Sequence, residues 1–190
     1  QTEVGTQAVL NGGRLENLTL RGPEEYRVVS AILDETALDG ALLSLEGEVR
    51  LTPAGLAWSG LVRFDYQDST SLIRGTDRNA LPPAIASDIE IHTGAGNGVI
   101  NGITTNGRIL IDQADRYIEM RDGWSNQGVV DLQAGDWRLG GEFTPDDIGT
   151  VNGSGGRVLI QGQLDLDQSV FDLATINAPP VFEDESYHSH

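Results

Sequence analysis

Short apolar segments, separated by glycine, asparagine and aspartate, recur along most of this chain. Examples are "NGVINGITTNGRILID" (97–112), "NQGVVDLQAG" (126–135) and "GGRVLIQGQLDLD" (155–167). Apolar and polar residues alternate within them, as at Val158 and Ile160, which is the pattern of a strand with one buried face. Each segment has room for only about three to five strand residues before the next turn. The chain must therefore turn far more often than an ordinary sheet protein does.

The spacing of these segments favours a β-solenoid over a β-sandwich. Gly-Arg followed by an aliphatic residue occurs at 13–15, 107–109 and 156–158, and the segments advance by roughly 20 to 25 residues. Repeats of that length are typical of coils that stack on one another. A sandwich, the alternative, more often shows longer strands joined by two-residue hairpins. We therefore predict an all-β solenoid.

One stretch has helical features. The segment 23–40, "PEEYRVVSAILDETALDG", begins with proline and two glutamates and ends with glycine, as many helices do. We expect a short helix here that caps one end of the solenoid or covers a face. The segment "TPDDIG" (144–149) predicts a single capped turn.

The 190 residues are enough for one domain. We expect a solenoid over 1–177, followed by an extended acidic tail or linker over 178–190. Prolines stiffen the start of this tail. We expect it to connect to further modules or to a neighbouring subunit, through the termini together with Pro179, Pro180 and Phe182.

The charge of the chain excludes some partners. There are 29 acidic and 12 basic residues, every basic residue is arginine, and the net charge is −17. Such a chain repels the phosphates of nucleic acids and anionic membranes. No apolar run approaches the length of a membrane-spanning helix, so we expect no membrane insertion. The acidic surplus fits adaptation to salt or Ca²⁺ binding, and the absence of lysine also fits a GC-rich genome.

Two groups of side chains are candidate ligand sites. The segment 112–124, "DQADRYIEMRDGW", gathers charged and aromatic residues that suit a glycan. Its candidate residues are Asp115, Arg116, Tyr117, Glu119 and Trp124. Asp165, Asp167 and Asp172 are candidate oxygen ligands for Ca²⁺, although they lack the spacing of a calcium-binding loop. We expect no other cofactor.

The region 126–177 resembles repeats of large bacterial surface proteins of the filamentous-haemagglutinin and autotransporter-passenger type. The resemblance rests on Asn126–Gly128, on "AGDWRLGG" (134–141), on "FTPDDIGTV" (143–151) and on "SGGRVLIQGQLD" (154–165). It implies a right-handed parallel β-helix and a secreted protein at the cell surface. The match is loose back to residue 87 and poor over 23–85.

We therefore expect an extracellular structural or adhesive protein that does no catalysis and that assembles with itself into filaments or binds a cell-surface glycan or protein. A carbohydrate-binding module of a secreted protein is the first alternative. A β-helical enzyme that degrades polysaccharides is the second, and it would require two carboxylates that face one groove.

Overall fold

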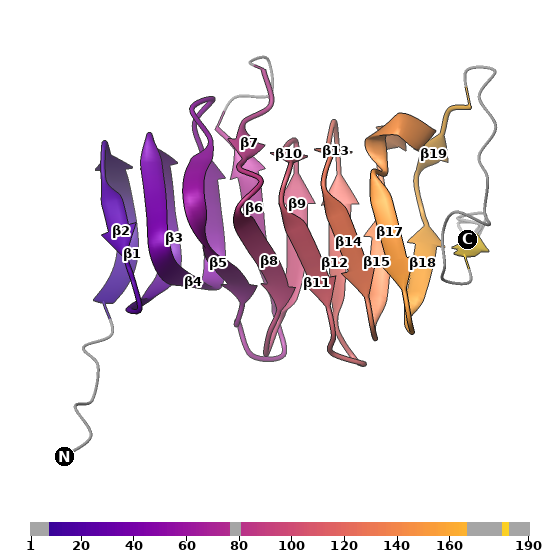
Figure 1. The fold of residues 1–190 in the computed structure, drawn as a ribbon, viewed down its shortest axis with the longest axis horizontal. Coiled ribbons are helices and arrows are strands. Elements are labelled where there is room, and N and C mark those ends of the chain that lie inside the picture. Colours follow the sequence, from indigo (N-terminus) through magenta and orange to yellow (C-terminus); the bar gives the residue numbers. More distant parts are fainter. Residues whose placement is uncertain (1–7, 77–80, 167–179, 183–190) are drawn as a thin grey trace, which may run out of the picture.

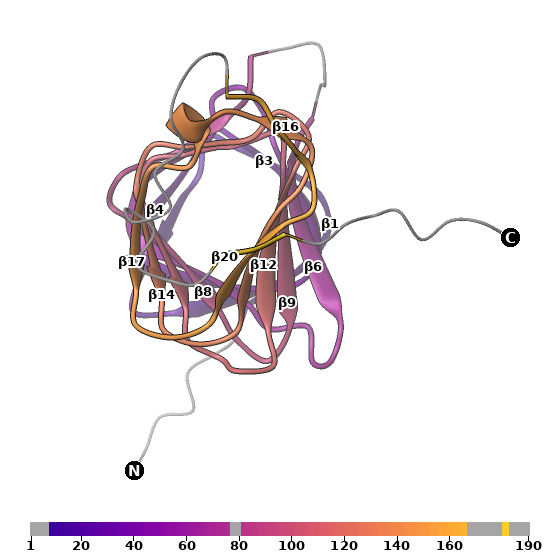
Figure 2. The same ribbon diagram turned by 90° about the vertical axis from the view of Figure 1, so that its right-hand side faces the viewer.

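The computed structural model describes residues 8–76, 81–166 and 180–182. They form a β-solenoid of about eight turns, the architecture of a right-handed parallel β-helix (Figure 1). The turns stack along one axis, and Figure 2 shows them end-on as a closed ring. The solenoid prediction is confirmed, and the β-sandwich alternative is wrong.

The strands wind around the axis as one continuous 18-stranded sheet with three sides, and their pairings are parallel. The first side contains β2 (Thr19–Arg21), the starts of β4 (Thr36–Leu51) and β5 (Leu56–Phe64), β7 (Ala84–Ile85), β10 (Thr104–Thr105) and β13 (Ser125–Asn126). The second contains the starts of β1 (Ala8–Glu16) and β3 (Glu25–Asp34), the middle of β4, the end of β5, β8 (Ile89–Thr93), β11 (Arg108–Ile111), β14 (Val129–Leu132) and β17 (Thr150–Gly153).

The third side contains the ends of β1, β3 and β4, then β6 (Thr70–Gly75), β9 (Asn97–Asn101), β12 (Tyr117–Arg121), β15 (Asp136–Leu139), β18 (Arg157–Ile160) and β20 (Pro180–Phe182). A separate pair, β16 (Glu142–Phe143) and β19 (Gln163–Leu164), extends the stack at the corner after the third side.

The side chains that point inward form ladders of like residues. Ile109 of β11 is in register with Val130 of β14, and Ile111 is in register with Leu132; all four are fully buried. Parallel strands lie about 4.8 Å apart, so each inward side chain rests directly on the one in the next turn. The apolar alternation in the sequence is therefore the lining of one continuous core.

Asparagine side chains add polar links between turns. Asn126 is fully buried; its Oδ1 accepts a hydrogen bond from Thr105 at 2.8 Å, and its Nδ2 donates to the Ile148 carbonyl at 2.8 Å. Thr105 and Asn126 are 21 residues apart, as are Asn152 and Asp131, which also bond between turns. These separations confirm the repeat length predicted from the sequence.

The helix expected over 23–40 is wrong, because this region forms β3 and the start of β4. Val28 and Leu33 point into the core, and β3 pairs with β1 on one side and with β4 on the other. β-branched residues favour strands, and pairing on both sides outweighs the helix-like end signals. The turn at 144–149 is confirmed as a 3₁₀ helix, η1 (Pro145–Asp147), where the Thr144 N–H donates to Asp147 Oδ2 at 2.9 Å.

Three residues of the segment expected to be a tail pair with the solenoid. The backbone of 180–182 forms β20, which pairs with β18 through Val158–Pro180 to Ile160–Phe182. These three residues therefore extend the third side by one more turn.

A glycine inside the core makes room for an aromatic ring. A Cβ atom at Gly98 of β9 would lie 2.2 Å from the ring atom Cε2 of Phe64, which is fully buried. We expect Gly98→Ala to lower the free energy of unfolding by about 1–3 kcal/mol through overpacking. In Gly98→Ala/Phe64→Leu the smaller side chain leaves space for the methyl group. Urea denaturation should show that the double mutant loses less than the sum of the two single changes; additive losses would contradict this packing.

Candidate functional site

The residues expected to bind a glycan do not lie together on one surface. β12 points Ile118 and Met120 inward and Glu119 outward on the third side. Asp115 is exposed at the corner before β12, and neighbouring Arg116 forms an ion pair with Asp68 at 2.7 Å. Trp124 lies at the corner after β12. The sequence cluster is therefore spread over two corners and one side of the solenoid.

Trp124 is part of the core and not a platform for sugars, which corrects the expectation. It is 2 % exposed and packs against Trp137 and Phe143, with ring centroids 6.3 and 5.3 Å apart. Its indole N–H donates to the Gly140 carbonyl at 2.8 Å. The residue lies at a corner, where strict alternation ends, so its direction was not readable from the sequence.

The Tyr117 ring is also in contact with another residue of the protein. The guanidinium carbon of Arg138 lies 3.8 Å from the ring centroid, a cation–π contact between neighbouring turns. Its hydroxyl is 3.3 Å from that of Thr70. Tyr117 thus joins turns on the third side, and one face of its ring is covered.

The two buried tryptophans permit a matched test. Trp137 is fully buried, but its indole N–H has no hydrogen-bond partner in the described residues, whereas that of Trp124 bonds to Gly140. Both Trp→Phe changes remove similar volume, but only Trp124→Phe leaves a buried carbonyl without its donor. We expect Trp124→Phe to cost about 1–3 kcal/mol more than Trp137→Phe. Equal costs in chemical denaturation would show that the bond to Gly140 contributes nothing.

A polar notch lies over Gly140 and Gly141, at the corner after the third side. Met120, Leu139 and Ile160 are in register, so the residues that follow them occupy successive turns as Arg121, Gly140 and Gln161. Gly140 thus interrupts this column of side chains, and a second glycine, Gly141, follows it. The resulting groove has a volume of about 460 Å³ and is lined by Glu119, Arg121, Asp122, Arg138, Gly140, Gly141 and Gln161.

The walls of this glycine notch carry both donors and acceptors. Arg121 forms two hydrogen bonds with Glu119, one of them from Nη2 to Oε2 at 2.8 Å. That pairing raises the pKa of Arg121 above its ordinary value, so the guanidinium stays charged. Asp122 Oδ2 accepts from Asn101 at 3.2 Å. Arg138 is 3.6 Å from Asp136 and makes no hydrogen bond within the part of the chain that the structure describes.

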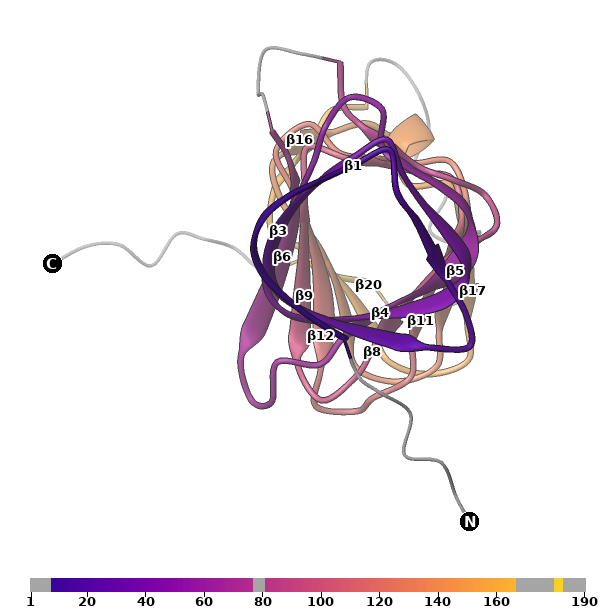
Figure 3. The same ribbon diagram turned by 90° about the vertical axis from the view of Figure 1, so that its left-hand side faces the viewer.

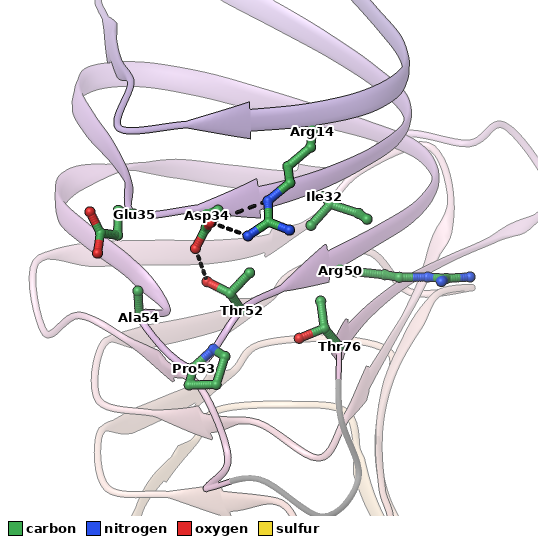
Figure 4. A pocket seen from close by; sticks show the side chains of 9 residues that line it. All are labelled: Arg14, Ile32, Asp34, Glu35, Arg50, Thr52, Pro53, Ala54 and Thr76. Carbon is green, nitrogen blue, oxygen red and sulfur yellow. Dashed lines mark hydrogen bonds and ion pairs between the residues drawn. The ribbon is translucent and has the colours of Figure 1, made fainter.

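A second groove, of about 620 Å³, lies near the N-terminal end (Figure 4). Asp34 is at its centre: Thr52 Oγ1 donates to Asp34 Oδ1 at 2.6 Å, and Arg14 Nε donates to Oδ2 at 3.2 Å. These bonds, first from Thr52 and then from Arg14, lower the pKa of Asp34. Arg14, Asp34 and Thr52 belong to three successive turns (Figure 4). This carboxylate therefore links turns, and its acceptor atoms are already occupied.

The Asp34 link predicts a dependence on pH. Because its pKa is lower in the folded chain than in the unfolded chain, ionised Asp34 stabilises the fold above about pH 4. This contribution falls as the pH drops below the ordinary aspartate pKa, and it is lost below the folded pKa. We expect Asp34→Asn to be less stable than the wild type at pH 7, with a smaller difference at pH 3. The control Asp115→Asn changes an exposed carboxylate that makes no hydrogen bond or ion pair to a described residue, and its stability should match that of the wild type at both pH values.

The Ca²⁺ and assembly candidates are only partly covered by the structure. Asp165 is exposed just after β19, whereas Asp167, Asp172 and Pro179 lie outside the described residues. In the described ranges, no three histidine or acidic residues cluster as a metal site. Pro180 and Phe182 lie in β20. The Ca²⁺ site and the assembly role stay predictions.

Comparison with protein-family models, curated proteins and solved structures finds no match to this chain. The resemblance to bacterial surface repeats therefore stays a prediction. Among the described residues, no helix has the length and apolar character needed to cross a membrane.

Proposed function

We propose that this chain is a structural and adhesive element of an extracellular surface, without catalysis, and that copies of it join end to end. The observation that supports this most is the unbroken stack of about eight parallel turns around one apolar core. Parallel strand pairings on three sides of the solenoid join successive turns, which stiffens the element. A stiff rod of this kind suits a stalk or a filament.

The outward charges support the same role, because many of them pair between neighbouring turns. Arg108 lies 3.6 Å from Glu90 of the preceding turn and 2.5 Å from Asp131 of the next. Arg157 donates two hydrogen bonds of 2.9 Å to Asp136, one turn away. Such networks reinforce the stacking from outside, and the acidic surplus keeps the surface soluble.

The N-terminal end supports self-association. Within the described residues, β1 pairs with β3 and with no other strand, so its outer edge faces away from the stack (Figure 3). An open strand edge is a template for another strand. Val9 of β1 is 52 % exposed at this edge. The partner proposed here is a second copy, whose last turn would continue the same three sides.

Electron microscopy of the purified chain tests this proposal. We expect rods longer than one copy, and fewer of them for Val9→Lys, because a charge at the edge opposes strand addition. The control Leu81→Lys alters an apolar residue that is 84 % exposed away from β1, and should leave the rods unchanged. Wild-type particles of a single short length would overturn the end-to-end proposal.

The location is tested with an antibody raised against the purified chain. We expect it to label intact cells of the source organism. Labelling only after the cells are made permeable would overturn the extracellular assignment.

A further inference from the structure

We propose that the glycine notch binds one sugar unit of a neutral glycan. This inference rests on the adhesive part of the proposed function and names the class of molecule that is bound. It is carried by the shape of the notch, by the chemistry of its walls and by the way its floor is fixed.

The shape arises from the missing side chain of Gly140, between Arg121 and Gln161. A Cβ at Gly140 would lie 3.1 Å from the Met120 carbonyl, with Glu119 Oε1 and Arg121 Cγ at 3.8 and 3.9 Å. A larger side chain at this position would therefore occupy the notch between Arg121 and Gln161. Adjacent turns are about 4.8 Å apart, so these two walls are separated by roughly 10 Å. The volume of about 460 Å³ lies within the usual range for small-molecule sites.

The chemistry of the walls favours hydroxyl groups. Arg121 and Arg138 only donate hydrogen bonds, whereas Glu119 and Asp122 only accept them. A sulfate or phosphate would meet two carboxylates, and a cation would meet two guanidinium groups. A neutral sugar satisfies both kinds of group, since each hydroxyl donates and accepts. Arg138 lines the notch, and its Nη2 is 3.6 Å from Asp136 Oδ2, beyond hydrogen-bond distance.

The floor is held in place before any ligand arrives. The Gly140 N–H donates to the Met120 carbonyl at 2.9 Å, and the Gly140 carbonyl accepts the bond from Trp124. A fixed floor reduces the entropy lost on binding. The described walls contain no aromatic ring for stacking, so we expect weak binding at one notch. Repetition along a filament would then strengthen attachment through multivalency.

Ligand-observed NMR with neutral oligosaccharides, namely glucans, galactans and mannans, tests the notch. Arg121→Ala is compared with Arg50→Ala. Each arginine pairs with a glutamate two residues earlier and is about half exposed, at 50 % for Arg121 and 46 % for Arg50. We expect binding by the wild type and by Arg50→Ala, and a loss of roughly tenfold or more in affinity for Arg121→Ala, because hydrogen bonds to a charged group are lost. Gly140→Leu should abolish binding by filling the notch, and its fold is checked by circular dichroism.

Three results would overturn the inference: no signal with any neutral glycan, equal weakening by Arg121→Ala and Arg50→Ala, or stronger binding of uronate or sulfated glycans. Electron microscopy of the same samples separates this inference from the proposed assembly. Rods without glycan binding would overturn only the notch. Binding without rods would overturn only the end-to-end joining.

Discussion

The stacking of parallel strands at a spacing of about 4.8 Å is the constraint on which the rest of this structure depends. It places each inward side chain directly on its counterpart in the next turn, as Ile109 lies on Val130. Like residues then pack on one another, and one apolar core runs the length of the solenoid. A side chain that is too large for its place affects a neighbouring turn, which is why Gly98 stands beside Phe64.

The corners must satisfy this constraint while the chain changes direction. Glycine serves where the backbone needs a positive φ, as at Gly141 with φ of 72°. Asn126 is a polar residue buried at a corner, and its side-chain amide bonds to both neighbouring turns, so its own oxygen and nitrogen are both paired. On the outer surface of the solenoid, the carboxylates of Asp34 and Asp136 also link turns, because each accepts hydrogen bonds from an adjacent turn. Stability in this chain is therefore built from contacts between turns.

The same constraint creates the glycine notch. Columns of outward side chains run along the third side, and a turn that carries glycine leaves a gap in its column. Glu119 and Arg121 come from one turn, Arg138 from the next and Gln161 from the one after. Trp124 contributes from inside, by holding the Gly140 carbonyl. The proposed site thus combines a rigid floor with polar walls.

The sequence by itself determined the solenoid, its repeat length and the turn at Pro145. Alternation and turn-forming residues are local, and a parallel stack repeats them in every turn. Only the tertiary structure decided three other points. Pairing on both sides made strands of 23–40, a corner turned Trp124 inward, and register brought Arg121 to within two turns of Gln161, 40 residues later. Each of these three points depends on contacts between residues far apart in the sequence, and a local sequence pattern does not predict such contacts.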